Sequence, residues 1–456
     1  MKEREKFGSR LGFILISAGC AIGLGNVWKF PYVVGQYGGS MFVLVYLIFL
    51  GILGLPIMVM EFAVGRGSKK SIARSFHELE PAGSKWHLFS LFGIAGNYLL
   101  MMFYTTVAGW MFIYFIKMAS GDFVGLDAEA VGGQFDLVLS QPLLMGSFMM
   151  LVVILGMVVC SQGLQNGVEK IMKPIMLGLL GLLVLLAIRS VTLDGAEEGL
   201  RFYLIPNLDI LETISLGEFI FAAMGQAFFT LSLGIGAMAI FGSYIDNSNT
   251  LTSAAIHVTL LDTSVAFISG LIIFPACFAF GIQPNAGTSL IFITLPNVFN
   301  HMPGGRLWGS LFFLFMVCAA MSTVIGVFEN IIACTVDRFH ISRQKASLYN
   351  CLIIALLSIP CVLGFNIWSG LEPLGANTGI LDLEDFIVSN NLLPLGSLFY
   401  LLFCTSRYGW GFDSLLAEAN KGKGVKFPRW IRPYVTYIIP ILILYIFIMG
   451  YKNLFF

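Results

Sequence analysis

The chain has few charged residues, and this scarcity excludes most classes of soluble protein. Only 11% of its 456 residues are Asp, Glu, Lys or Arg, whereas 57% are hydrophobic. An ordinary soluble domain does not have such a composition. The 26 basic residues balance the 26 acidic residues, so no net charge attracts the chain to nucleic acid. We therefore expect a protein of the lipid bilayer with no nucleic-acid partner.

The sequence also lacks the patterns of a disulfide framework, a metal centre and a cleaved signal peptide. The eight cysteines lie in or beside apolar runs without metal-type spacing, and we interpret them as small buried hydrophobic residues. The five histidines form no motif, and no nucleophile–base set is visible, so we predict that the protein is not an enzyme. Residues 1–10 are charged but precede no short apolar core with a cleavage site.

The sequence consists largely of long apolar runs. Runs of about 20 apolar residues are long enough to cross a bilayer as helices. They lie near residues 11–36, 41–65, 88–118, 143–160, 167–189, 217–242, 252–280, 307–336, 345–364, 384–404 and 432–451. The sequence therefore predicts an all-α membrane protein with eleven transmembrane helices.

Lys and Arg predict the orientation of these spans. If the N-terminus is inside, most basic residues fall in inner segments, as the positive-inside rule requires. We therefore expect a cytoplasmic N-terminus and an outer C-terminus, in a bacterial-type inner (plasma) membrane. One long outer loop, 283–304, contains a mostly apolar segment too short to span, which we expect to form a re-entrant lid.

Two spans are interrupted by glycines and polar residues. Residues 19–31 contain three glycines followed by Asn26, Lys29 and Pro31, and residues 225–236 repeat a Gly-x-Gly after polar residues. Each glycine costs a helix interior up to about 1 kcal/mol relative to Ala. One interpretation is a close-packing face; the other is a broken helix whose backbone groups hold a polar solute. Interruptions at matching places in two halves favour the second.

The two breaks fall in the first and the sixth span, each the first member of five. They predict a 5+5 inverted repeat with helices 1 and 6 broken at mid-membrane. The predicted parts are a first repeat 1–190, an outer loop 191–216, a second repeat 217–404, an inner loop 405–431 and a last span with the C-terminus, 432–456.

The motif GLGNVWKFPY, the run GQAFFTLSLGIG and the pair Ser322-Thr323 resemble the neurotransmitter:sodium symporter family, specifically its shorter bacterial amino-acid transporters with eleven spans. The resemblance implies that the two broken helices bind the substrate near the midplane of the bilayer, as they do in that family. The resemblance implies import of an L-amino acid with sodium by alternating access. It implies one or two Na⁺, of which we favour two, and a monomer that suffices for transport, with a dimer as the alternative.

The resemblance also implies which residues hold the ions. The first sodium set is the Ala21 carbonyl with Asn26, Thr230 and Asp262; the second is the carbonyls of Gly19, Ile22 and Ala319 with the hydroxyls of Ser322 and Thr323. The alternative for the two hydroxyls is a hydrogen bond to their own helix.

For the substrate, the family pattern implies a pocket between the two broken helices. Its residues are Cys20, Ala21, Gly23, Leu24, Gly25, Leu100, Tyr104, Phe229, Thr230, Ser232, Ile235, Thr323, Gly326 and Val327. Monoamine members carry Asp at the position of Gly23, so glycine there favours a ligand with its own carboxylate. Leucine-type relatives carry bulkier groups at the positions of Ile235 and Gly326, so the smaller residues here favour a hydrophobic or aromatic side chain, tyrosine or tryptophan above all.

Intramembrane acids are costly and therefore functional by default. Chloride-dependent relatives have Asn at the position of Asp262, which here precedes Ala266 by one turn. We expect Asp262 to supply the fixed negative charge beside Tyr46 and Gln226, so that chloride is not required. Glu61 is expected to hold amides of the broken sixth helix.

Charge placement predicts two gates. The outer gate pairs Lys29 with Asp385; the inner gate pairs Arg4 with Asp337, near Phe7 and Tyr244. Opposed gates argue against a channel of the same fold. Two alternatives stay open at this stage: an amino-acid-binding membrane receptor, and a facilitator without sodium coupling.

Overall fold

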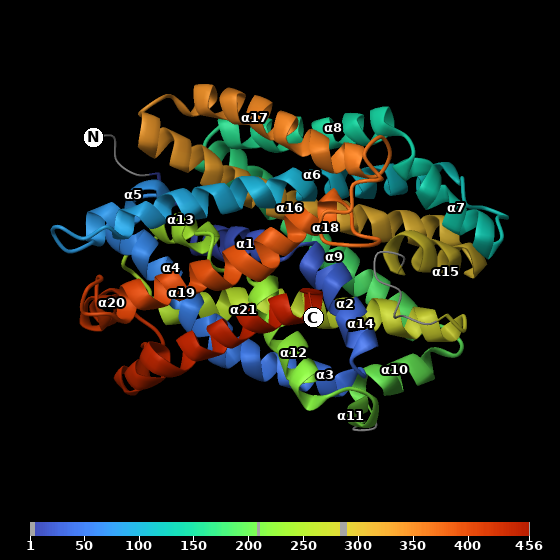
Figure 1. Ribbon diagram of the computed structural model, residues 1–456. Helices are drawn as coiled ribbons and strands as arrows, with labels where there is room; N and C mark the ends of the chain where they lie inside the picture. The colour runs from blue at the N-terminus through green and yellow to red at the C-terminus, as the bar shows by residue number, and fades with distance from the viewer. Residues whose placement is uncertain (1–4, 208–209, 283–289, 456) are drawn as a thin grey trace.

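The chain folds into one bundle of long helices. The computed structural model describes residues 5–207, 210–282 and 290–455, and over these residues no strand forms. Figure 1 shows the long helices running along one common direction, so that the molecule has two ends. α5 (Ile72–Leu79) and α20 (Phe412–Ala419) lie at one end, and α7 (Ala128–Leu139) and α10 (Ala196–Leu204) lie at the other.

Nine helical segments among the described residues are long and apolar enough to cross a bilayer. They are α3–α4 (Ser40–Ser68), α6 with its preceding turn (Trp86–Ser120), α8 (Pro142–Ser161), α9 with its preceding turn (Leu164–Val191), α14 (Leu251–Ala279), α16 (Gly305–Phe339), α17 (Arg343–Gly364), α18–α19 (Ile380–Thr405) and α21 with its preceding turns (Arg429–Lys452). α16 is central and contacts α1 (Arg10–Ala21), α6, α8, α9 and α17. The prediction of an all-helical membrane protein is confirmed.

The two remaining predicted spans are the interrupted ones. α1 and the segment Gly25–Gln36 form a tenth apolar unit bent by 58°. The predicted span 217–242 is divided between α12 (Leu216–Thr230) and α13 (Ala237–Ser243), each too short to count as a span. The number eleven and the inverted repeat therefore stay predictions.

The first break follows from the glycines and polar residues of its sequence. α1 begins after Ser9, whose hydroxyl accepts a hydrogen bond from the Gly12 amide, and it ends where Ile22 turns to an extended conformation. The chain resumes with a wide π-type turn, η1 (Gly25–Lys29), and continues as α2 (Phe30–Gln36). Because the break lies inside the bundle, its amides need partners. The side chain of Asn26 supplies one, since its Oδ1 accepts from the Gly23 amide at 3.2 Å.

The second break is a tight turn between α12 and α13. Ser232, Gly234 and Gly236 have positive φ angles of 49°, 98° and 77°, and glycine takes that conformation without strain. Glu61, on α4 (Leu55–Ser68) and fully buried, accepts from the Gly234 amide at 2.5 Å and from the Met238 amide at 3.3 Å. Protein side chains thus satisfy the backbone that the break frees.

The predicted lid, 283–304, is described from residue 290 on, and residues 283–289 lie outside the described part. Its described part contains η5 (Leu290–Thr294) and α15 (Leu295–His301). The ring of Phe292 stacks on Phe135 of α7 at 4.6 Å and meets Trp28 edge-on at 6.0 Å. This part therefore connects α7 to the segment after the first break.

Candidate functional site

Three polar side chains from three helices converge beside the first break. Asn26 Nδ2 donates to Thr230 Oγ1 at 3.1 Å and to Asp262 Oδ1 at 2.9 Å. Thr230 Oγ1 donates to Asp262 Oδ2 at 3.1 Å. All three side chains are buried. This cluster brings together the side chains of the predicted first sodium set, with Ala21 at the adjacent end of α1. Its amide, hydroxyl and carboxylate oxygens are the hard ligands that alkali and alkaline-earth ions take.

The predicted second sodium set gathers between α1 and α16. Ser322 Oγ donates to the Ile22 carbonyl at 3.2 Å and to the Ala319 carbonyl at 2.8 Å. Thr323 Oγ1 donates to the same Ile22 carbonyl at 3.3 Å. Ser322 therefore bonds both within its own helix and across to α1. Gly19 lies one turn before Ile22, where α1 packs closely on Met172 and Met176 of α9.

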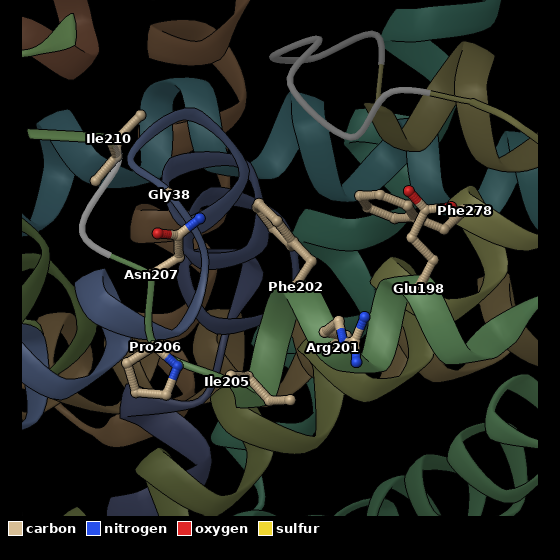
Figure 2. Close-up of a pocket in the computed structure, with 9 residues that line it drawn as sticks. All are labelled: Gly38, Glu198, Arg201, Phe202, Ile205, Pro206, Asn207, Ile210 and Phe278. Carbon is tan, nitrogen blue, oxygen red and sulfur yellow. The ribbon is translucent and has the colours of Figure 1, made fainter. Parts of the chain in front are cut away.

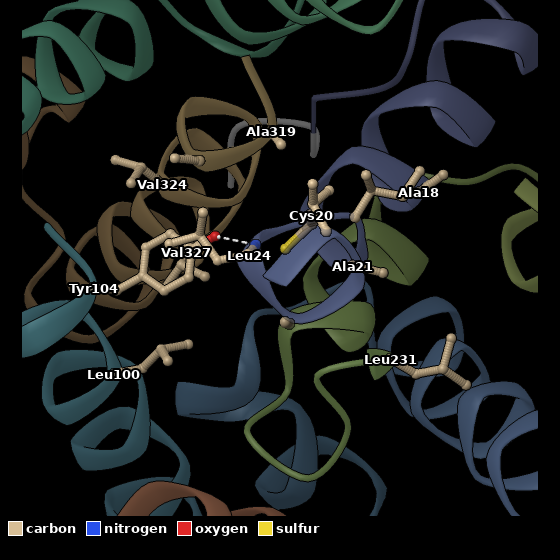
Figure 3. Packing of buried hydrophobic residues seen from close by; sticks show 14 of the residues in the cluster. Ala18, Cys20, Ala21, Leu24, Leu100, Tyr104, Leu231, Ala319, Val324 and Val327 are labelled. Atoms are coloured by element: carbon tan, nitrogen blue, oxygen red, sulfur yellow. Dashed lines mark hydrogen bonds between the residues drawn. The ribbon is translucent and has the colours of Figure 1, made fainter. Parts of the chain in front are cut away.

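A small cavity separates the two breaks. It measures about 40 Å³, which is room for only a few water molecules. Its lining contains Ala21, Gly23, Leu24, Gly25, Leu100, Tyr104, Phe229, Thr230, Ser232 and Thr323 of the predicted pocket, together with Phe103, Val388 and Leu393. Figure 3 shows Tyr104 pointing at the end of α1, where its hydroxyl accepts from the Leu24 amide at 3.1 Å.

Four residues of the predicted pocket are absent from this lining: Cys20, Ile235, Gly326 and Val327. All four are buried. Cys20 packs so closely on Gly326 that an added Cβ on Gly326 would lie 2.7 Å from the Cys20 sulfur. Ile235 packs in the same way on Gly96 of α6. Side chains therefore fill the space that the small residues leave.

Tyr46 of α3 (Ser40–Phe49) and Gln226 of α12 are the residues predicted to lie beside Asp262. Gln226 Nε2 donates to the Gly25 carbonyl at 3.4 Å, and Tyr46 packs on Phe30 with ring centroids 5.0 Å apart. Among the described residues, neither the Tyr46 hydroxyl nor Gln226 Oε1 has a hydrogen-bond partner, although both atoms are buried. Such atoms are costly unless something polar joins them.

A larger pocket of about 310 Å³ lies on the far side of Phe229 and Tyr104, which line both spaces. Lys29 and Asp385 line it as well. No Lys29–Asp385 ion pair is found within the described part of the chain; the Lys29 ammonium lies over the Phe229 ring, 3.7 Å from its centroid. Asp385 accepts from Ser389. The ring is thereby fixed between the two pockets by a cation–π contact.

Arg4, of the predicted inner gate, lies outside the described residues. Its predicted partner Asp337 accepts from the Ser71 amide at 2.8 Å. Phe7 meets Tyr244 edge-on at 5.8 Å, and Tyr244 donates to Glu329 at 2.6 Å.

Sequence reasoning missed three contacts that acidic side chains make at the end of the bundle near Asp337. Fully buried Glu329 of α16 pairs with Arg343 at the start of α17. Glu5 accepts from the Leu164 amide at 2.7 Å, and Glu169 accepts from the Gly8 amide at 2.8 Å. An acid inside the eighth apolar run was the available signal for Glu329.

A more voluminous pocket lies elsewhere, beside α10. It measures about 620 Å³ and is lined by Gly38, Glu198, Arg201, Phe202, Ile205, Pro206, Asn207, Ile210 and Phe278. Figure 2 shows Glu198, Arg201 and Phe202 on one helix, α10, beside this space. None of these residues belongs to the predicted site, so volume alone does not locate it.

Comparison with known proteins agrees with this arrangement. The model of the sodium:neurotransmitter symporter family matches residues 4–123 and 141–455. The uncharacterized sodium-dependent transporter YhdH of Bacillus subtilis is 35% identical over 454 residues, which cover 98% of each chain. A sodium-dependent transporter of Haemophilus influenzae is 32% identical over 462 residues, again 98% of each chain. The crystal structure of MhsT in complex with L-phenylalanine has a TM-score of 0.87 and 37% identity, over 98% of this chain and 100% of that one.

These matches extend over almost the whole chain and include both broken helices. The family is one of symporters and not of enzymes, and both of these relatives are described as sodium-dependent transporters. The chain is therefore a multi-pass membrane transporter that belongs to the sodium:neurotransmitter symporter family.

Proposed function

We propose that the protein imports a hydrophobic or aromatic L-amino acid together with sodium, by alternating access and without a need for chloride. The observation that carries this proposal is the buried cluster of Asn26, Thr230 and Asp262 beside a cavity between two broken helices. The chain's similarity to a transporter solved with L-phenylalanine supports an amino acid with an apolar side chain as the substrate.

Coupling in this proposal needs no chemical step. A substrate carboxylate completes the shell of the first sodium, so each ligand raises the affinity of the other by the same factor. Two sodium ions that cross 100 mV with a zwitterion supply about 4.6 kcal/mol, since each charge contributes about 2.3 kcal/mol. The second ion is assigned to the carbonyls of Gly19, Ile22 and Ala319 with the hydroxyls of Ser322 and Thr323. Both hydroxyls lie within hydrogen-bond distance of the Ile22 carbonyl, and that of Ser322 also of the Ala319 carbonyl.

The end of α1 is suited to a carboxylate. The Leu24 amide already meets the Tyr104 hydroxyl, and both groups can donate to an anion. The ammonium group of the substrate would donate to the carbonyls near Ala21 and Phe229 and to the hydroxyl of Ser232. An aromatic side chain needs more room than the cavity of about 40 Å³ offers. In our proposal Phe229 turns away to admit it, which requires Lys29 to leave the ring.

The gates complete the proposed cycle. Lys29 and Asp385 close the outer pocket, and Arg4 with Asp337 closes the inner end. Spans 1, 2, 6 and 7 rock against the rest between the two closures. We place the N-terminus in the cytoplasm and the C-terminus outside, and a monomer suffices for this cycle.

An added methyl group at Gly23 is expected to weaken substrate binding. A Cβ there would lie 2.5 Å from Thr323 Oγ1 and 2.6 Å from the Tyr104 hydroxyl. Overpacking of this kind costs about 1–3 kcal/mol, so Gly23→Ala should weaken amino-acid binding about tenfold. The loss of affinity is measured by competition of unlabelled against labelled tyrosine for binding to each variant. Gly225→Ala, in the other broken helix, is the matched control because nothing lies within 4 Å of an added Cβ; equal affinity in both variants would contradict the assignment.

Uptake into proteoliposomes tests the function itself. Purified protein is given labelled tyrosine with an inward sodium gradient and without one, in chloride and in gluconate. We expect accumulation above equilibrium only with the gradient, and equally in both anions. Equilibration without sodium would indicate a facilitator, and binding without flux for any amino acid would indicate a receptor.

A further inference from the structure

Two histidines and a glutamate meet at the end of the bundle that carries α5. Glu80 Oε1 lies 3.1 Å from His77 Nδ1 and 2.7 Å from His87 Nδ1. The three ligand atoms all lie within 4.8 Å of one another. The sequence showed no histidine motif because the two rings are ten positions apart, and only the loop between α5 and α6 (Phe89–Ser120) brings them together.

The loop holds its carboxylate in place and leaves the imidazoles open to solvent. Glu80 Oε2 accepts from Ser84 Oγ at 2.8 Å and from the His87 amide at 3.2 Å. Its side chain is only 7% exposed, whereas those of His77 and His87 are 68% and 42% exposed. Burial acts against the charge of Glu80, but hydrogen bonds from Ser84, His87 and His77 outweigh it and hold its pKa below the usual value. The buried carboxylate therefore faces two solvent-exposed rings.

We propose that His77, Glu80 and His87 bind a divalent transition-metal ion of the Zn²⁺ class. Two imidazoles and one carboxylate are a ligand set that Zn²⁺ takes, with a fourth position for water. A carboxylate only accepts hydrogen bonds, so each Nδ1 now carries the proton that points at Glu80. The ion replaces these two protons. They move to the solvent-facing Nε2 atoms or to water, and the rings approach to coordination distance, about 2.0–2.1 Å from the ion.

Metal binding at this point would tie two long helices together. α5 follows α4, and the loop leads directly into α6, whose first residues pack on α19 (Leu393–Thr405) through Phe89 and Phe399. Trp86 beside the site donates to the Tyr408 carbonyl at 2.7 Å. In the proposed function, α4 belongs to a moving span and α6 to a stationary one. The ion therefore slows transport, a consequence that rests on the proposed function, while the binding does not.

Binding is measured first, on the full chain with its purification tag removed and after EDTA treatment. Titration with ZnCl₂ should give one ion per chain, and Co²⁺ should give the visible absorption of a four-coordinate site. The double variant His77→Ala/His87→Ala should weaken Zn²⁺ binding by at least about tenfold, the low end of what lesser changes around metal sites cost. Both rings are exposed, so thermal melting without metal should stay at the wild-type value.

His340→Asn is the matched control. This histidine is also exposed, and Asn tolerates its positive φ of 55°. Wild-type Zn²⁺ binding should persist in this control. Equal Zn²⁺ binding by the wild type and the double histidine variant, or none by the wild type, would overturn the site.

Transport is measured separately, as labelled tyrosine uptake with and without ZnCl₂. Zn²⁺ should slow the wild type and His340→Asn but leave the double variant unchanged. If Zn²⁺ binds but does not alter uptake, the proposed slowing of transport by the ion is wrong. Absence of uptake in every variant, with binding intact, would count against the proposed function and leave the metal site standing.

Discussion

Replacement of Asp262 by Asn is expected to make transport depend on chloride. The substitution keeps the shape of the side chain: an amide oxygen can still accept from Asn26, and the new amide nitrogen can donate to Thr230. What is lost is one buried negative charge. Hydrogen bonds to a charged group contribute about 1.5–3 kcal/mol, so uptake in gluconate should fall at least about tenfold. Chloride, which can take the place of the missing charge, should restore part of it.

The measurement is the initial rate of sodium-driven tyrosine uptake in chloride and in gluconate, for the wild type, for Asp262→Asn and for the control Asp194→Asn. Asp194→Asn removes a carboxylate from an exposed loop and should behave as the wild type in either anion. If Asp262→Asn transports in gluconate at the wild-type rate and ignores chloride, Asp262 is not the fixed charge. Loss of uptake that chloride does not restore would assign Asp262 to sodium binding alone.

The breaks could be predicted from the sequence because their signal is local. Glycines and polar residues inside an apolar run are visible without knowledge of neighbouring helices, and the ends of α1 and α12 fall where they occur. The gathering of Asn26, Thr230 and Asp262 could be predicted only through resemblance, since 236 residues separate the first from the last. Local patterns carry no information about such a contact.

The parts that sequence reasoning did not reach depend on packing. Opposite charges suggested Lys29 and Asp385 as partners, but the position of the Phe229 ring decides where the ammonium lies. Small residues suggested an open pocket, yet Cys20 fills the space beside Gly326. Glu329 and Arg343 belong to different helices, and only their approach in the fold makes them a pair.

Removal of the Glu61 carboxylate is expected to disrupt the second break and, with it, transport. Glu61 is fully buried and accepts from the amides of Gly234 and Met238. In Glu61→Ala both amides lose their acceptor inside the bundle, where water does not replace it, and each costs about 1–3 kcal/mol. The turn that they stabilise carries Ser232 and follows Thr230 directly, so both the cavity and the first cluster should lose their geometry.

Two measurements separate this role from a direct part in ion binding. Glu61→Ala should lower the apparent melting temperature by a few degrees and reduce sodium-driven uptake at least about tenfold. The melting temperature and the uptake rate of Glu61→Gln should lie between those of Glu61→Ala and the wild type. Its side-chain oxygen can accept from one backbone amide, but its side-chain nitrogen is a donor and cannot accept from the other. Glu197→Ala, at an exposed position of α10, should change neither quantity. A Glu61→Ala protein that melts as the wild type but no longer responds to sodium would instead place this carboxylate among the ion ligands, because a group that only supports the backbone cannot be lost without a cost in stability.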